Sequence, residues 1–128
     1  MSPRAYQPFL PARRPGRRPR ELPRFRVLIH RHYAELWEQL ADRVGLESAQ
    51  QFYDHVARTP GEPPAIGRTT ILAGKAGLPK ADGFSRTVHY EISGAGRINY
   101  QYNDEFTGGE RGDSHSVVYI LTIDLSSH

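Results

Sequence analysis

The chain has 128 residues, which suits a single domain, and it has no cysteine, which excludes disulfides, thiolate metal sites and thiol catalysis. Its net charge of +3 is unevenly divided: residues 1–26 hold eight arginines and one glutamate, whereas residues 27–128 hold nine basic and thirteen acidic residues. The sequence lacks an apolar run of about 20 residues and the apolar core of a secretion signal. We therefore expect a cytoplasmic protein that makes no contact with a membrane.

The first 23 residues are rich in proline and arginine, and six of the ten prolines lie here. Proline removes backbone donors and fixes φ, so neither a helix nor a strand ladder can run through this segment. We predict a disordered arm over residues 1–23 and a folded domain over residues 24–128. The charge of the arm would attract polyanions such as RNA, although a solvated extension without a function is the simpler interpretation.

A strand and two helices are predicted next. Phe25, Val27 and Ile29 alternate with other residues, which is the period of a strand. One apolar stripe at helical spacing follows and ends at Gly45; it consists of Tyr33, Leu36, Trp37, Leu40 and Val44. A second helix is predicted over residues 47–58, before Pro60. Two short antiparallel helices joined by a tight turn make a helical hairpin.

Three strands are predicted after a loop rich in proline and glycine over residues 60–83. The first, over residues 84–92, has Arg86 within an otherwise apolar face and His89 on the opposite, polar face. The turn at residues 93–96 indicates a hairpin into a strand over residues 97–103. The last strand, over residues 116–125, is apolar on both faces and is expected at the centre of the sheet.

The predicted fold class is therefore α+β, with the order β-α-α-β-β-β and an antiparallel sheet packed against the helical hairpin. None of the six histidines has the spacing of a metal motif, and we predict neither a metal nor a cofactor. Arg97 and His89 lie on polar strand faces that could bind a phosphodiester. Arginine can stabilise a pentavalent phosphate, and histidine can move the proton of a 2′-hydroxyl. A merely solvated sheet face is the alternative.

With this order of elements, the chain resembles the RelE/ParE superfamily of toxins from bacterial toxin–antitoxin modules. The resemblance covers about residues 25–125 and is carried by the segments LAGKAG, GFSRTVHYEISGAGRINYQY and VVYILTID. The stretch from Gly96 to Tyr102 stands where that family has a Y-R-x-x-Y-x-V strand, and the stretch from Val117 to Ile123 stands in the place of its last strand. The acidic domain and the basic arm depart from the family pattern.

The resemblance implies a toxin that cuts messenger RNA, usually on the ribosome and without a metal, and that a small antitoxin protein neutralises. It would make Arg97 the residue that stabilises the phosphate. It places Arg86 and His89 on the basic strand, and His128 where several members have a terminal acid or base. Two alternatives stay open: a ParE-like toxin that inhibits a topoisomerase without nuclease activity, and a non-catalytic protein-binding module.

Overall fold

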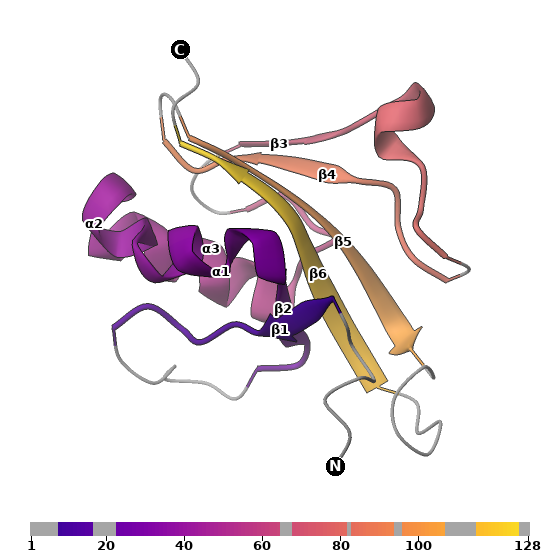
Figure 1. Cartoon of the computed structure of the whole chain (residues 1–128). Coiled ribbons are helices and arrows are strands. Elements are labelled where there is room, and N and C mark those ends of the chain that lie inside the picture. The colour runs from indigo at the N-terminus through magenta and orange to yellow at the C-terminus, as the bar shows by residue number, and fades with distance from the viewer. Residues whose placement is uncertain are drawn as a thin grey trace.

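A six-stranded sheet with the three α-helices on one face organises the chain (Figure 1). The computed structural model describes residues 8–16, 23–64, 68–81, 83–93, 96–106 and 115–125. The strands are β1 (Phe9–Pro11), β2 (Arg26–His30), β3 (Arg68–Ile71), β4 (Val88–Glu91), β5 (Arg97–Phe106) and β6 (His115–Asp124). The helices are η2 (Arg31–Tyr33), α1 (Ala34–Glu38), α2 (Leu40–Val44), α3 (Leu46–Arg58) and η3 (Gly74–Gly77). The chain is therefore an α+β protein.

The sheet is mixed, so the prediction of an antiparallel sheet is wrong at one pair. The strands are ordered β1-β2-β6-β5-β4-β3, and β2 runs parallel to β6, with Leu28 beside Tyr119. The other four neighbouring pairs are antiparallel. A tight turn fixes the relative direction of strands that are consecutive in the chain, whereas β2 and β6 are joined through all the elements between them. The expected central position of β6 is confirmed, because it lies between β2 and β5.

The main core lies between the helices and the sheet. Helix α3 spans Leu46–Arg58, which agrees closely with the second helix predicted over residues 47–58. The side chain of Phe52, on this helix, is fully buried. The predicted first helix is divided into α1 and α2, which Gln39 separates. Gly45 ends α2 with a φ of 97°, a conformation that favours glycine. Other fully buried members of this core are Leu40, Ala49, Val56, Ile98, Tyr100, Val118 and Ile120.

A second apolar cluster lies on the opposite face of the sheet, which we call the open face. Its members are Phe9, Leu28, Phe84, Val117 and Tyr119, with Leu121 packed against them. The segment before β4 lies over this cluster, because the buried side chain of Gln101 donates to the carbonyl of Leu78 at 2.9 Å and accepts from the backbone N–H of Lys80 at 3.0 Å. The predicted strand over residues 84–92 is consequently shorter and begins at Val88.

Residues 8–16, which we call the N-terminal strap, are ordered, so the prediction of a disordered arm is wrong for them. Strand β1 pairs antiparallel with β2, and the ring of Phe9 stacks on Tyr119 with 4.1 Å between centroids. The prolines did not prevent this, because an edge strand tolerates a residue without an N–H group. Pro11 is such a residue, on the outer strand of the sheet. Residues 1–7 and 17–22 of the predicted arm lie outside the described residues.

The second half of the strap is tied to the helices. Arg14 Nε lies 2.8 Å from Asp54 Oδ1 in an ion pair with α3. The indole Nε1 of Trp37 donates to the carbonyl of Arg13 at 3.0 Å, and Gln50 Nε2 donates to the carbonyl of Pro15 at 3.0 Å. These contacts join the strap to residues that lie 24 to 40 positions away in the sequence.

Deleting residues 1–16 is expected to destabilise the domain, because Phe9 is 3 % exposed and Ala12 is 7 % exposed. Loss of a buried phenylalanine alone lowers the free energy of unfolding by about 3–5 kcal/mol. Urea unfolding should therefore show a clear loss for the truncated chain and for Phe9→Ala. Leu10→Ala is the matched control, since Leu10 is 42 % exposed. Equal midpoints for the truncated and full chains would show that the strap does not stabilise the domain.

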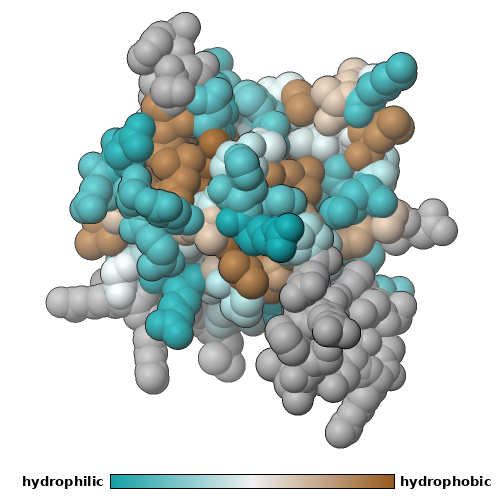
Figure 2. Space-filling view, viewed as in Figure 1, coloured by the Kyte–Doolittle hydropathy of each residue, from teal (hydrophilic) through white to brown (hydrophobic). Residues whose placement is uncertain are grey.

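The remaining exposed apolar side chains are scattered. Leu10, Leu46, Ile71 and Leu78 are the large exposed hydrophobic residues in the described ranges, and they come from different segments. In the view of Figure 2, apolar surface is divided into patches between hydrophilic side chains. Scattered exposed hydrophobic residues are ordinary for a protein surface. None of the helices in the described part of the chain is long and apolar enough to cross a membrane.

Candidate functional site

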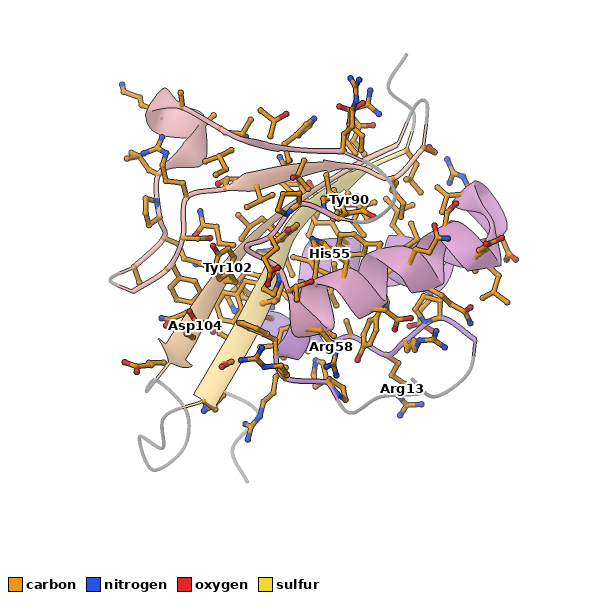
Figure 3. The ribbon with its side chains drawn as sticks, turned by 180° about the vertical axis from the view of Figure 1, so that it is seen from behind. Arg13, His55, Arg58, Tyr90, Tyr102 and Asp104 are labelled. Atoms are coloured by element: carbon orange, nitrogen blue, oxygen red, sulfur yellow. The ribbon has the colours of Figure 1, made fainter. Side chains whose placement is uncertain are left out.

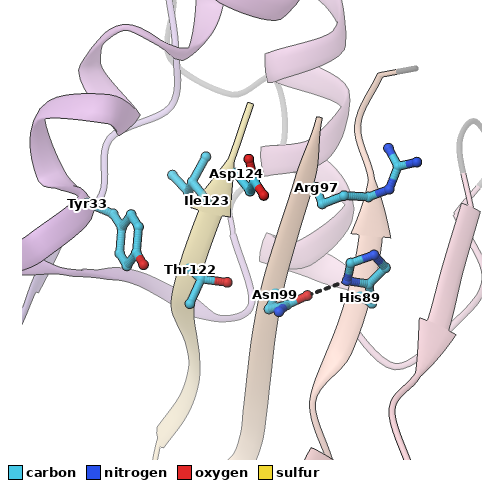
Figure 4. A pocket seen from close by; sticks show the side chains of 7 residues that line it. All are labelled: Tyr33, His89, Arg97, Asn99, Thr122, Ile123 and Asp124. Atoms are coloured by element: carbon cyan, nitrogen blue, oxygen red, sulfur yellow. Dashed lines mark hydrogen bonds between the residues drawn. The ribbon is translucent and has the colours of Figure 1, made fainter. Parts of the chain in front are cut away.

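A polar depression of about 470 Å³ lies on the open face, beside the second apolar cluster (Figure 4). Strand pairing assembles it: Arg97 of β5 lies opposite Glu91 of β4, and Asn99 lies opposite His89. On the other side of β5, the same two residues lie opposite β6. Because side chains alternate along a strand, these polar residues share one face. The lining residues are Tyr33, His89, Arg97, Asn99, Thr122, Ile123 and Asp124.

The neighbouring strand orients the ring of His89. Its Nδ1 lies 2.6 Å from Oδ1 of Asn99 (Figure 4). With the amide oxygen facing the ring, Nδ1 carries the hydrogen in the neutral imidazole, and Nε2 keeps its lone pair. An amide sets this tautomer without adding a charge to the site. In the neutral ring, this tautomer leaves Nε2 of His89 as the proton acceptor.

The hairpin turn between β4 and β5 anchors Arg97. Its Nη1 donates to the carbonyls of Ser93 and Gly96, both at 2.9 Å. Its Nη2 lies 3.6 Å from Oε1 of Glu91, and the two side chains are 27 % and 34 % exposed. A long, partly solvated ion pair of this kind contributes at most about 1 kcal/mol. The guanidinium is thus fixed in position, while a phosphate could replace Glu91 as its anionic partner.

Five lining residues were not identified as site residues from the sequence: Tyr33, Asn99, Thr122, Ile123 and Asp124. The sequence pattern places Tyr33 on a helical stripe, but in the structure it belongs to η2, directly after β2. Its ring meets those of His32 and His30, with centroids 4.9 and 6.4 Å apart. The strand pattern puts Asn99 on a polar face, but only the structure shows that it orients His89. Thr122 and Asp124 could have been noticed in the sequence, because these two polar residues interrupt the apolar pattern near the end of β6.

Arg86, one of the residues proposed from the sequence, does not line the depression. Arg86 precedes β4, and its guanidinium donates to the carbonyls of Leu72 at 2.9 Å and Gly74 at 2.7 Å. These bonds fix the chain around η3, where a side chain at Gly77 would collide with Leu72 and Arg86. Arg86 therefore binds backbone carbonyls outside the depression that His89 and Arg97 line. His128 lies outside the described residues.

Two histidines on other elements have lowered pKa values. Burial lowers the pKa of His55 on α3, which faces Tyr90 with ring centroids 6.0 Å apart (Figure 3), and Glu62 acts in the opposite direction. Burial also lowers the pKa of His30, and the nearby His32, Arg31 and Lys80 add to the effect. Within the described ranges, no group of three or more histidine, aspartate or glutamate residues could hold a metal ion.

Because the pKa values of these two histidines are lowered, we expect the protein to lose stability in mild acid. In the unfolded chain, histidine binds a proton near pH 6.5, whereas the folded protein binds it only at lower pH. Their contribution is complete above about pH 6.5 and decreases as the pH falls toward the lowered folded pKa values. The melting temperature should therefore fall between about pH 7.5 and 5.5. His55→Gln should make this decline shallower, and parallel curves for variant and wild type would contradict the assignment.

Comparisons with known proteins identify no relative. No protein-family model, no curated protein and no solved structure matches the chain. A functional interpretation therefore depends on the residues and the geometry described above.

Proposed function

We propose that this chain is a metal-independent endoribonuclease that cleaves single-stranded messenger RNA at the depression on the open face. One observation carries the proposal. Asn99 orients His89 in the tautomer whose neutral ring has Nε2 as the proton acceptor, and Arg97 is anchored on the same face of the neighbouring strand. Cleavage of RNA without a metal needs these two functions, a proton acceptor and a fixed cation.

The chemistry is an in-line transesterification. Nε2 of His89 takes the proton of a 2′-hydroxyl, and the 2′-oxygen forms a bond to phosphorus while the bond from phosphorus to the 5′-oxygen breaks. Arg97 balances the added negative charge of the phosphorane. The incoming phosphate takes the place of Glu91 as the anionic partner of Arg97. The leaving 5′-oxygen takes a proton from the hydroxyl of Tyr33, which borders the same depression. The products are a 2′,3′-cyclic phosphate and a 5′-hydroxyl, and solvent returns the imidazole and the phenol to their starting forms.

The proposal extends to the partners that the RelE/ParE resemblance implies. The chain would act as a toxin on messenger RNA, in the ribosome or free in solution, and a small antitoxin protein would neutralise it. Glu91 and Asp124 keep acidic groups beside Arg97. Such groups weaken the attraction of RNA to the site, so a ribosome that positions the messenger would have a larger effect here than on a basic toxin.

The test is cleavage of single-stranded RNA by the purified full chain in excess EDTA, with and without ribosomes. We expect fragments that end in a 2′,3′-cyclic phosphate. Inducible expression in bacteria should also arrest growth, and co-expression of a cognate antitoxin should restore it. Growth arrest without RNA fragments would overturn the nuclease in favour of a topoisomerase inhibitor. If expression causes no growth arrest and no RNA fragments appear, the protein-binding module is the alternative that remains.

A further inference from the structure

A second cluster of basic and aromatic side chains lies next to the depression, also on the open face. The ammonium of Lys80 lies 5.3 Å from the ring centroid of Phe9 and 5.8 Å from that of Tyr119. The ring of His30 meets the edge of Phe9 with 5.2 Å between centroids. Phe9 and His30 face each other across the β1–β2 pair, so the strap contributes directly to this cluster. We call these four residues the Lys80 cluster.

The Lys80 cluster carries positive charge, and none of the described carboxylates forms an ion pair with it. Among the residues that the structure describes, no carboxylate oxygen lies within 4 Å of the Lys80 ammonium. The charged neighbours that act on His30 are all basic: His32, Arg31 and Lys80. Nδ1 of His30 accepts a hydrogen bond from the backbone N–H of His32 at 3.1 Å. Nε2 of the neutral ring therefore carries a hydrogen that it can donate to an anion.

Tyr33 connects the Lys80 cluster to the depression. Its ring lines the depression and also meets His30, with 6.4 Å between centroids. Along β6, Tyr119 belongs to the cluster and Thr122 to the depression. Three residues of a strand span about 10 Å. A ligand that occupies both places must therefore be longer than one nucleotide.

We propose that Lys80 and His30 form a phosphate subsite, which holds a flanking phosphodiester of a single-stranded RNA while the ring of Tyr33 stacks on a base between the subsite and His89. This combination of cations and aromatic rings is the usual means by which proteins hold single strands. The inference rests on the proposed function for its choice of RNA. It adds that the substrate is an oligonucleotide and that the strap helps to form its binding surface.

The experiment measures binding separately from cleavage. The probe is a fluorescent 2′-O-methyl RNA octamer, which has no 2′-hydroxyl to attack, and its anisotropy gives the affinity of the full chain at several salt concentrations. Lys80→Ala should weaken binding several-fold and reduce the slope of log K against log salt by about 0.7, the value for one phosphate contact on a single strand. The variant should fold, because the bond from Lys80 to Gln101 uses the backbone N–H.

Lys75→Ala is the matched control, since Lys75 is an exposed lysine of η3 in the same segment. Equal effects of the two substitutions would overturn the subsite, and so would an oligoglutamate peptide that binds as tightly as the octamer. Binding that depends on Lys80, in a protein that never cleaves RNA, would support the subsite and reject the nuclease. If the Lys80→Ala variant binds the octamer as wild type does and the protein cleaves RNA, the subsite is rejected and the nuclease is supported.

Discussion

His89→Ala should slow RNA cleavage about 10²–10⁴-fold, because it removes the group that accepts the proton of the 2′-hydroxyl. Arg97→Ala should slow it about 10²–10³-fold, the loss that follows removal of a donor that stabilises transition-state charge. Arg97→Lys keeps the charge but not the two bonds to the carbonyls of Ser93 and Gly96, and should fall between alanine and wild type. On expression, each variant should lose growth arrest in proportion to its loss of cleavage rate.

Two comparisons make this test specific. Arg68→Ala changes an exposed arginine on β3, which does not line the depression, and should cleave as wild type does. Glu91→Gln removes the carboxylate that faces Arg97 and should lower KM for RNA, because less negative charge opposes the phosphate. If purified, folded His89→Ala and Arg97→Ala both cleave at the wild-type rate, the site has been assigned wrongly.

Trp37→Ala should lower the free energy of unfolding by about 3–5 kcal/mol, a large part of the total for a small domain. Trp37 is 3 % exposed, and its ring packs against Phe52 and Tyr53, with centroids 6.1 and 6.4 Å away. Its bond to the carbonyl of Arg13 also holds the strap, so the substitution removes contacts on two sides of the ring. Urea unfolding followed by circular dichroism measures the change.

Trp37→Phe separates the two contributions of this residue. Phenylalanine keeps most of the buried ring but has no N–H group to donate, so its loss should be smaller, near the 1–3 kcal/mol of an unsatisfied carbonyl. A native fluorescence spectrum like that of tryptophan in water would show instead that the ring is solvated and that the helical layer is oriented differently.

Local patterns predicted much of the core. Helix α3, the hairpin between β4 and β5, and the central place of β6 followed from apolar spacing and turn residues. The prediction that His89 and Arg97 stand on polar strand faces came from the same alternation, and the strand register brings the two faces together. The pattern did not reveal β3, because its four residues Arg68–Ile71 are mostly exposed at the edge of the sheet and show little alternation.

The N-terminal strap shows why amino-acid composition was a poor guide to the structure of the first residues. Its prolines and arginines are typical of disorder, yet Phe9 and Ala12 are buried in two different clusters. A three-residue strand has no useful period, and what holds it are contacts with Tyr119, Trp37 and Asp54, far along the chain. Arg86 is a similar case, because only the folded chain brings the carbonyls of Leu72 and Gly74 to its guanidinium.

By itself, the sequence determined the α+β class, the limits of α3 and the apolar faces of β4, β5 and β6, because these depend on the period of side chains along one element. Only the tertiary structure decided that β2 pairs parallel with β6, that the strap belongs to the domain, and that Tyr33 and Asp124 join His89 in one depression. The physical reason is the same in each case. These contacts join residues that are distant in the sequence, and no local pattern records which distant partner a side chain meets.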